Sequence, residues 1–422
     1  MSGYHLEAIR GLRVAHIIES DGPGGAERMV VDFAVALRRA GCENLAVLPV
    51  DGEGWLGREL AGNGIAAEGF DYGHLVDLGS VRTLARLLRS HRIEVAHSHE
   101  FTMAVYGALA ARAAGIPHVI TMHGSQYFNT RLRRRLGLRL AVSWSGATVA
   151  VSGELARAMS RDLWLRPERI RVIPNGVSFT PAHRSSLREE LCLGPGDRLA
   201  VAVGNLYPVK GHVHLLDALG LLRVQLPQLH VAIAGRGNLD TALRARADEL
   251  GLSDRFHLLG FRKDVANILA GADVFVLPSL SEGLPLALLE AMAAWCPIVA
   301  SDVGEVRTAL DDGRAGLLVS PGDARSLANS LARVVGHGSE ADRLRAAAGN
   351  RAAAEYGLST MVERYVRVYK RLLRESRGND GGSGRRPFGR APRARGSTTP
   401  APVSPRGSGP ATEVEAGGHV KQ

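Results

Sequence analysis

The sequence predicts an α/β protein with two parallel β-sheets, each covered by helices on both faces. Between residues 13 and 376, short apolar runs rich in β-branched residues alternate with longer helical stretches, which is typical of parallel sheets. A polar break near residues 178–187 interrupts this alternation, which then starts again. A chain of 422 residues is also long for one hydrophobic core and sufficient for two.

The expected strands fall into two groups along the chain. The first group comprises residues 14–18, 46–50, 95–97, 118–123, 147–152 and 171–174, and the second comprises residues 199–204, 230–235, 256–260, 274–278, 298–301 and 316–319. The expected helices include residues 26–37, 211–222, 323–335, 340–356 and 360–375. We therefore assign residues 1–180 to an N-terminal domain and residues 181–376 to a C-terminal domain. The last helix, at about residues 360–375, is expected to cross back onto the first domain.

The segment 377–422 is expected to be a disordered basic tail, because its Gly, Ser, Pro and Arg residues show no apolar periodicity. It carries about half of the formal net charge of +10, so the expected domains are only mildly basic. That balance suits an anionic substrate or an anionic membrane surface. We do not expect nucleic-acid binding, because the aromatic content is only 5% and supplies no stacking surface.

The cysteines and the apolar runs indicate where the protein works. Cys42, Cys192 and Cys296 are widely separated and form no CxxC pair, which argues against a disulfide framework or a zinc site and favours a reducing compartment. The first 18 residues lack the apolar core of a signal peptide, and no apolar run is long enough to span a bilayer. We therefore expect a cytoplasmic protein.

Two glycine-containing loops join an expected strand to an expected helix. The first carries Gly24 and Gly25, and such glycines let the backbone and the free amides of a helix N-terminus approach an anion. The second, Gly204-Asn-Leu-Tyr-Pro-Val-Lys-Gly211, places Lys210 at the start of a helix. A lysine there opposes the helix dipole, so we expect it to serve an anionic ligand and not the fold. The alternatives are an ordinary turn and a solvated lysine.

The segment 278–292 (PSLSEGLPLALLEAM) is the strongest motif. Glu282 lies in a loop after an expected strand, while Glu290 lies on an otherwise apolar helix and therefore needs a hydrogen-bond partner. Ribose and sugar hydroxyls are suitable donors to these carboxylates, and the amides of Gly283, Leu284 and Leu286 are suited to phosphate. The alternative is a capping acid with a structural ion pair.

Three histidines end expected strands: His97, His99 and His123. We considered a metal site, but no acid or cysteine completes a ligand set at a familiar spacing, so no metal is expected. For His123 a hydrogen bond to a sugar and a structural role are equally open.

Together with Ile173-Pro-Asn-Gly-Val177 and Gly24-Gly-Ala-Glu-Arg28, these motifs resemble glycosyltransferase family 4, the retaining group 1 glycosyltransferases of the GT-B fold. The resemblance covers residues 13–374 in matching order. It implies two Rossmann-like domains that face each other across a cleft, with the acceptor on the N-terminal side and the nucleotide sugar on the C-terminal side. It also implies a metal-independent transferase that needs no cofactor.

The resemblance assigns a role to each motif. Lys210 is expected to hold the diphosphate, Glu290 the ribose, and Gly24 and Gly25 to approach the phosphates. Glu282 and His123 are expected to contact the donor sugar, and with Lys210 they form the expected catalytic set. The remaining expected substrate-binding residues are Asn205, Arg262, Gly283, Leu284 and Leu286.

Two positions depart from the family pattern. Asn205 stands where the family usually has an arginine, which removes a bidentate cation from the diphosphate site. Trp295 stands where a small residue is common. Two alternatives therefore stay open beside the transferase: a sugar-nucleotide epimerase or hydrolase of the same architecture, and a non-catalytic relative that only binds nucleotide sugars.

The acceptor is expected to be a saccharide or a lipid-linked glycan used in cell-surface or exopolysaccharide synthesis. The segment 131–145 interleaves arginines with leucines and other apolar residues. A basic amphipathic helix of this kind can lie on an anionic membrane and bring a lipid-linked acceptor to the cleft. An ordinary solvated helix face is the equally weighted alternative.

Overall fold

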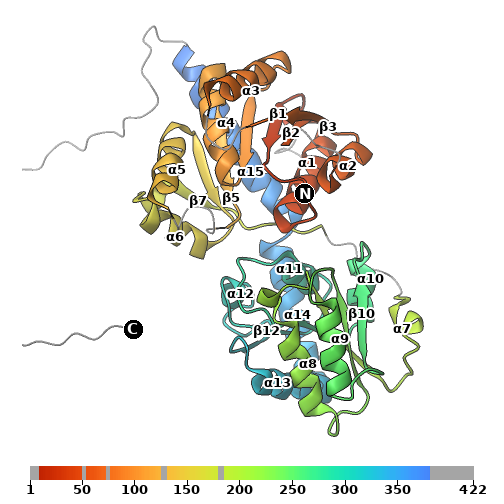
Figure 1. Cartoon of the computed structure of the whole chain (residues 1–422). Helices are drawn as coiled ribbons and strands as arrows, with labels where there is room; N and C mark the ends of the chain where they lie inside the picture. The colour runs from red at the N-terminus through yellow and green to blue at the C-terminus, as the bar shows by residue number, and fades with distance from the viewer. Residues whose placement is uncertain (1–8, 50–53, 73–76, 125–130, 179–184, 381–422) are drawn as a thin grey trace, which may run out of the picture. The chain divides into compact units, whose positions relative to one another are not determined.

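Two parallel sheets form the fold, as the alternating pattern predicted (Figure 1). The structure is a computed structural model, which describes residues 9–49, 54–72, 77–124, 131–178 and 185–380. These residues all belong to one compact unit. Residues 179–184 of the expected polar break near residues 178–187, and most of the expected tail, lie outside the described residues.

The first sheet has seven strands in the order β3-β2-β1-β4-β5-β6-β7, and all neighbours are parallel. Its strands are β1 (Arg13–Ile17), β2 (Glu43–Pro49), β3 (Ala66–Phe70), β4 (Val95–His99), β5 (His118–Met122), β6 (Ala147–Ala150) and β7 (Ile170–Val172). The intervening helices are α1 (Gly25–Arg39), α2 (Trp55–Gly62), α3 (Leu78–Ser90), α4 (Phe101–Ala114), α5 (Leu132–Trp144) and α6 (Gly153–Asp162).

The second sheet has six parallel strands in the order β10-β9-β8-β11-β12-β13. Its strands are β8 (Arg198–Val203), β9 (Leu229–Ala234), β10 (Phe256–Gly260), β11 (Val274–Leu277), β12 (Ile298–Ser301) and β13 (Leu317–Val319). Its helices are α7 (Leu187–Glu190), α8 (His212–Leu222), α9 (Asp240–Glu249), α10 (Val265–Gly271), α11 (Leu286–Ala293), α12 (Val306–Ala309) and α13 (Ala324–Gly336), followed by α14 (Gly338–Glu355) and α15 (Leu358–Asp380).

Strand β3 is a strand that the sequence analysis missed. It lies at the edge of the first sheet, and only the last of its five residues is buried. An edge strand with little burial has no apolar pattern to reveal it, and its sequence AAEGF contains few residues that favour strands.

Both sheets reverse their strand order at one point, between β1 and β4 in the first and between β8 and β11 in the second. In open parallel sheets, ligands bind beyond the carboxyl ends of the strands at such a switch point. The first loop follows β1, the second follows β8, and the loop that carries Glu282 follows β11. The topology therefore brings the predicted motifs to the edges where a ligand is expected.

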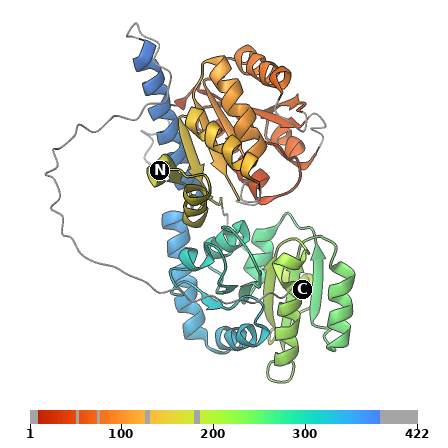
Figure 2. The same ribbon diagram turned by 60° about the vertical axis from the view of Figure 1, so that its left-hand side comes forward.

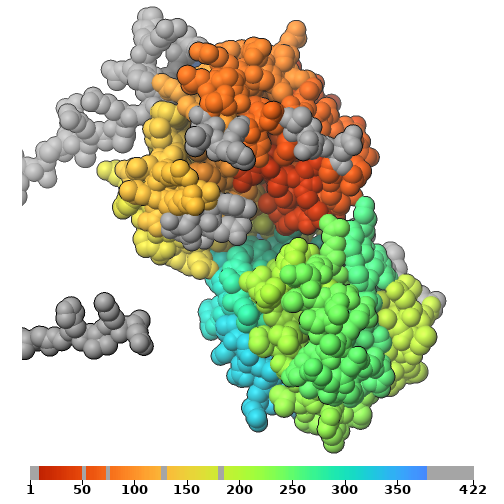
Figure 3. Space-filling view, in the orientation of Figure 1, coloured from red at the N-terminus to blue at the C-terminus, as the bar shows by residue number. Residues whose placement is uncertain are grey.

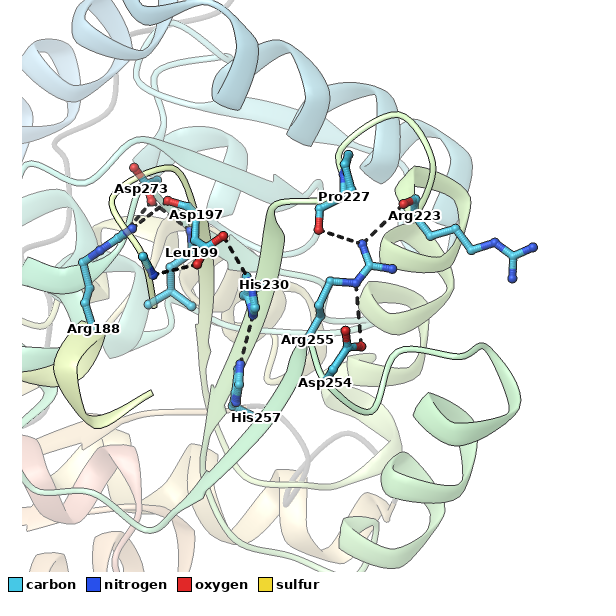
Figure 4. A network of polar contacts seen from close by, with 11 residues as sticks. Arg188, Asp197, Leu199, Arg223, Pro227, His230, Asp254, Arg255, His257 and Asp273 are labelled. Carbon is cyan, nitrogen blue, oxygen red and sulfur yellow. Dashed lines mark hydrogen bonds and ion pairs between the residues drawn. The ribbon is translucent and has the colours of Figure 1, made fainter. Parts of the chain in front are cut away.

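The opposite, amino-terminal edge of the second sheet is held by a polar network (Figure 4). Asp273 accepts hydrogen bonds from the Arg188 guanidinium at 3.0 Å and from the Leu199 amide at 2.8 Å. The rings of His230 and His257 are joined at 3.2 Å. These contacts fasten the starts of strands β8 to β11 and leave their carboxyl ends to the loops.

Helix α15 returns to the first sheet, as the sequence analysis predicted (Figure 2). Its Tyr369 hydroxyl is 2.7 Å from Nδ1 of His97 on β4, and its Tyr365 hydroxyl is 3.0 Å from Oγ1 of Thr121 on β5. Both tyrosines are buried against Phe33 of α1. Residues 377–380, which the sequence analysis assigned to the tail, continue this helix, because a helix already packed on a core extends beyond its last apolar turn.

We predict that Tyr369→Phe lowers the free energy of unfolding by about 1–3 kcal/mol, because it leaves Nδ1 of buried His97 without a partner. The measurement is urea unfolding followed by circular dichroism. The control is Tyr207→Phe, at a residue that is 47% exposed, for which we expect a change within about 0.5 kcal/mol. Equal stabilities of the two variants would contradict the prediction.

Candidate active site

A cavity of about 510 Å³ lies at the carboxyl ends of the strands and takes its lining from loops of both sheets. Every residue that the sequence analysis selected lines it: Gly24, Gly25, His123, Asn205, Lys210, Arg262, Glu282, Gly283, Leu284, Leu286 and Glu290. These residues come from five segments that are far apart in the chain. The switch points of the two sheets bring them together.

Lys210 and Glu282 form an ion pair in the cavity. The Lys210 Nζ atom lies 2.8 Å from Oε1 and 3.1 Å from Oε2 of Glu282. The Ser279 hydroxyl donates to the same carboxylate at 2.6 Å, and the Glu282 side chain is only 8% exposed. The carboxylate is therefore fixed in one position, while the Lys210 side chain, which is 26% exposed, lines the cavity.

Close backbone packing holds the second loop against the neighbouring strand. Gly211 has φ +64°, and a Cβ atom there would collide with the Pro278 carbonyl at the end of β11. A Cβ atom on Gly235 would collide with the Gly204 carbonyl. Only glycine permits both approaches, which bring Lys210 within reach of Glu282.

Two helix N-termini face the cavity without a side-chain cap. Helix α1 begins at Gly25 after Gly24, and α11 begins at Leu286 after Pro285. The first amides of a helix have no partner within the helix and carry the positive end of its dipole. Gly24, Gly25 and Leu286 all line the cavity, so these amides are available to an anionic ligand.

Glu290 lies on α11 among apolar residues and lines the same cavity. Burial raises the pKa of its carboxyl to about 7, an effect that the positive charge of Arg28 partly offsets and the negative charge of Asp32 reinforces. At neutral pH this carboxyl therefore exchanges readily between two states. In the ionised state both carboxylate oxygens are free to accept hydrogen bonds from ribose hydroxyls, whereas in the protonated state one oxygen carries a proton.

His123, directly after β5, borders the cavity from the first sheet. Its Nε2 atom lies 3.3 Å from Nδ1 of His99, and its own Nδ1 is buried without a partner. Burial lowers the pKa of His123 to about 4, so its ring is neutral at pH 7. A neutral imidazole with one uncommitted nitrogen can form a hydrogen bond with a sugar hydroxyl.

The histidines beneath this site form a buried polar layer. In the described part of the chain, His16, His97 and His99 have ring nitrogens within 4.8 Å of one another, the spacing of a possible metal site. Both ring nitrogens of His97, however, already have partners, at 2.7 Å from Tyr369 and 2.7 Å from Thr121. These hydrogen bonds account for His97 as a structural residue under α15. Metal independence stays a prediction.

All four cations that line the cavity among the described residues are paired with carboxylates. They are Arg28 with Asp32, Lys210 with Glu282, Arg262 with Asp264 and Glu190, and Lys263 with Glu59. Arg262, which the sequence analysis expected to bind substrate, lines the cavity, but three 2.7 Å contacts hold its guanidinium on Asp264 and Glu190. Asn205 is exposed and lines the cavity without a charge.

Several lining residues carried no role in the sequence analysis. Arg28 and Lys263 supply cations, Phe261 supplies an aromatic face that is 47% exposed, and Asn175 is buried with an unpartnered Oδ1. Asn175 lies in the Pro-Asn-Gly motif, so the sequence could have identified it as a candidate site residue. Arg28 likewise lies in the Gly24-Gly-Ala-Glu-Arg28 motif, whereas Lys263 and Phe261 sit on a chain segment with no local signal.

Comparison with known proteins agrees with this geometry. The family described as "Glycosyl transferases group 1" matches residues 184–351, and the family described as "Glycosyltransferase Family 4" matches residues 23–180. A UDP-Gal:α-D-GlcNAc-diphosphoundecaprenol α-1,3-galactosyltransferase of Escherichia coli is 31% identical over 61% of this chain and 70% of its own length. The chain belongs to glycosyltransferase family 4.

Other relatives share the family and differ in their reactions. A D-inositol 3-phosphate glycosyltransferase of Thermobispora bispora is 32% identical over 70% of this chain and 74% of its own length. Among solved structures, a glycosyltransferase from Rickettsia africae has a TM-score of 0.77 at 18% identity, covering 86% of this chain and 99% of its own. Anabaena HepE in complex with UDP has a TM-score of 0.74 at 23% identity, covering 85% and 100%. These structures confirm the GT-B fold of this glycosyltransferase.

We predict that the affinity of this glycosyltransferase for its nucleotide sugar falls about tenfold between pH 8 and pH 6, because protonation of Glu290 removes a hydroxyl acceptor. The carboxyl is mostly ionised above its raised pKa of about 7 and mostly protonated below it, so binding weakens as the pH falls. Titration calorimetry with an intact nucleotide sugar measures the effect.

The variant Glu290→Gln is the control for this pH dependence. It should bind weakly at every pH and show a flat profile, because its amide does not titrate in this range. An equally steep profile in this variant would assign the titration to another group.

Proposed function

We propose that this protein transfers a sugar, with retention of anomeric configuration, from a nucleoside-diphosphate sugar to a saccharide acceptor. One observation carries the proposal: a Lys210–Glu282 pair set in a cavity between two uncapped helix N-termini. A leaving nucleoside diphosphate gains negative charge during transfer, and an ammonium and free amides are the groups that stabilise it. No metal is needed in this arrangement.

The ion pair has a defined part in the proposed reaction. When the donor binds, its diphosphate becomes a second partner for Lys210, and the ammonium bridges this diphosphate to Glu282. The fixed carboxylate of Glu282 then accepts a hydrogen bond from a donor-sugar hydroxyl. Glu290 accepts from the ribose, and His123 meets the donor sugar from the first sheet. The donor is thus held at its ribose, its phosphates and its sugar.

A UDP-linked sugar is the donor we propose first. Its support comes from similar proteins: one relative is named for UDP-Gal, and HepE was solved with UDP and with UDP-glucose. Phe261, Val265 and Ala266 give the cavity an apolar end of the kind on which a base can pack.

We predict that Lys210→Ala lowers turnover at least about 100-fold, because the charge of the leaving group loses its cation. Thermal shift with UDP-, GDP- and ADP-sugars in EDTA identifies the donor, since a ligand that binds only the native state raises the melting temperature. The same shift should vanish in the variant.

The matched control is Arg223→Ala, which removes an exposed cation at the end of α8, away from the cavity. Its turnover should stay near that of the unchanged protein. If Lys210→Ala also keeps near-unchanged turnover, the proposed role of Lys210 at the leaving group is refuted. A melting-temperature shift that is seen without EDTA but disappears in EDTA would refute metal-independent donor binding.

The acceptor is proposed to be lipid-linked and presented at the inner face of the plasma membrane. No helix in the described ranges is apolar over enough residues to cross a bilayer. Helix α5, at the surface in Figure 3, instead exposes Leu132, Leu136 and Leu140 at 62%, 52% and 47%, spaced four residues apart on one face. Such a row of leucines beside arginines can insert at a lipid interface.

Neighbouring groups extend this face. Arg139 donates at 2.7 Å to the carbonyl of Trp164, whose side chain is 54% exposed, and tryptophan favours the membrane interface. The E. coli relative acts on a diphosphoundecaprenol-linked sugar by its name, which supports a lipid-linked acceptor here.

We predict that the purified protein floats with vesicles that contain phosphatidylglycerol, and that replacing Leu132, Leu136 and Leu140 together by Ser lowers the bound fraction several-fold. The control is Leu78→Ser, at a leucine that is 69% exposed at the start of α3. A protein that fails to float even at low salt would refute membrane contact.

A further inference from the structure

A second cavity, of about 490 Å³, adjoins the donor cavity on the side of the first sheet. Gly25, Ala26 and His123 line both cavities, so the second one opens beside the proposed position of the donor sugar. A group that occupies it would lie next to the reacting end of the donor. Its position is therefore the one expected for the acceptor. This assignment rests on the proposed function.

Three carboxylates from separate segments line this second cavity: Glu19 after β1, Glu27 on α1, and Glu100 after β4. Among the described lining residues none is lysine or arginine. The second cavity is thus acidic, whereas the donor cavity contains four cations.

Two of these carboxylates have partners within the protein. Glu19 Oε2 accepts the amide of Thr102 at 3.1 Å, at the start of α4. Glu27 accepts the Ser20 hydroxyl. These hydrogen bonds hold both side chains in place and give each carboxylate a structural role.

Glu100 lacks such a partner for its second oxygen. Its side chain is 91% buried, leaving 9% exposed, and the Oε2 atom has no hydrogen-bond partner. Burial, followed by the negative charges of Glu19 and Glu27, raises the pKa of Glu100 to about 8. At pH 7 its carboxyl is mostly protonated and offers a donor and an acceptor to whatever fills the cavity.

We propose that the second cavity binds the reacting sugar of an acceptor that carries no phosphate or carboxylate on that sugar, and that Glu100 forms a hydrogen bond with one of its hydroxyls. Sugar hydroxyls donate well to carboxylates and accept from a protonated carboxyl. A phosphate group would face Glu19 and Glu27 with no cation among the described lining residues, and like charges at short range repel.

This inference separates the chain from relatives named for a phosphorylated acceptor. The Thermobispora bispora relative is a D-inositol 3-phosphate glycosyltransferase by name. A lipid-linked acceptor is compatible with the inference where at least one further sugar separates the reacting sugar from the lipid diphosphate, because the charge then lies outside the second cavity. Specificity here arises from repulsion of the wrong acceptor as well as attraction of the right one.

The test compares matched pairs: neutral methyl glycosides and disaccharides, and the same sugars with a phosphate ester on the ring. Binding to the full-length protein with UDP present is measured by saturation-transfer NMR and titration. We expect each neutral sugar to bind at least about tenfold more tightly than its phosphate ester. A phosphate ester that binds equally well or better would overturn the inference.

Variants of Glu100 and Glu19 test which residues bind the neutral sugar and which disfavour the phosphate ester. Glu100→Ala should weaken the neutral sugar about tenfold, and Glu100→Gln should restore most of this loss because its amide also donates and accepts. Glu19→Gln, which removes one charge, should narrow the discrimination against phosphate. The control Glu43→Gln lies at the start of β2, at the opposite edge of the sheet, and should change neither value.

Nucleotide binding by the same samples distinguishes the two proposals. A protein that binds no nucleotide at all would refute the proposed function. A protein that binds nucleotide normally but no neutral saccharide, or one whose Glu100→Ala variant binds saccharide unchanged, would overturn the inference about the second cavity alone.

Discussion

The reversal of strand order within each parallel sheet is the constraint on which the site depends. Adjacent strands at the reversal send their following loops and helices to opposite faces, which leaves a crevice at the carboxyl edge. In the second sheet the loops after β8 and β11 flank this point and carry Lys210 and Glu282. The ion pair between them is therefore a consequence of topology, because these residues are 72 positions apart in the chain.

Charge compensation in the unliganded cavity shapes how the donor is received. Each cation among the described lining residues already has a carboxylate partner, so the positive charges of the cavity are largely compensated. A diphosphate can share Lys210 with Glu282, whereas Arg262 is held by two acids. Asn205 contributes no charge of its own. The amides of α1 and α11 then supply the part of the attraction that needs no side chain.

The two adjoining cavities differ in electrostatic character, because the donor cavity has cations that are each paired with a carboxylate, whereas the second cavity has carboxylates and no cation among its described lining residues. An anionic donor is favoured beside Lys210, and a neutral sugar is favoured beside Glu19, Glu27 and Glu100. His123 lines both cavities and is neutral because of burial, so it separates them without adding charge to either. Below it, the His97–Tyr369 contact ties the same sheet to α15.

The alternating pattern by itself predicted the two parallel sheets. The motifs, with the family that they resemble, predicted eleven of the residues that line the donor cavity, because strand ends and helix starts are local features. The edge strand β3 was not predicted from the sequence, because an apolar pattern reflects burial and only one residue of this strand is buried. Only the tertiary structure decided that Arg262 is paired with acids, and that Glu100 meets Glu19 and Glu27 in one cavity. The Arg262–Glu190 contact and the grouping of the three glutamates join segments that are distant in the chain, and no local pattern encodes a distance across a fold.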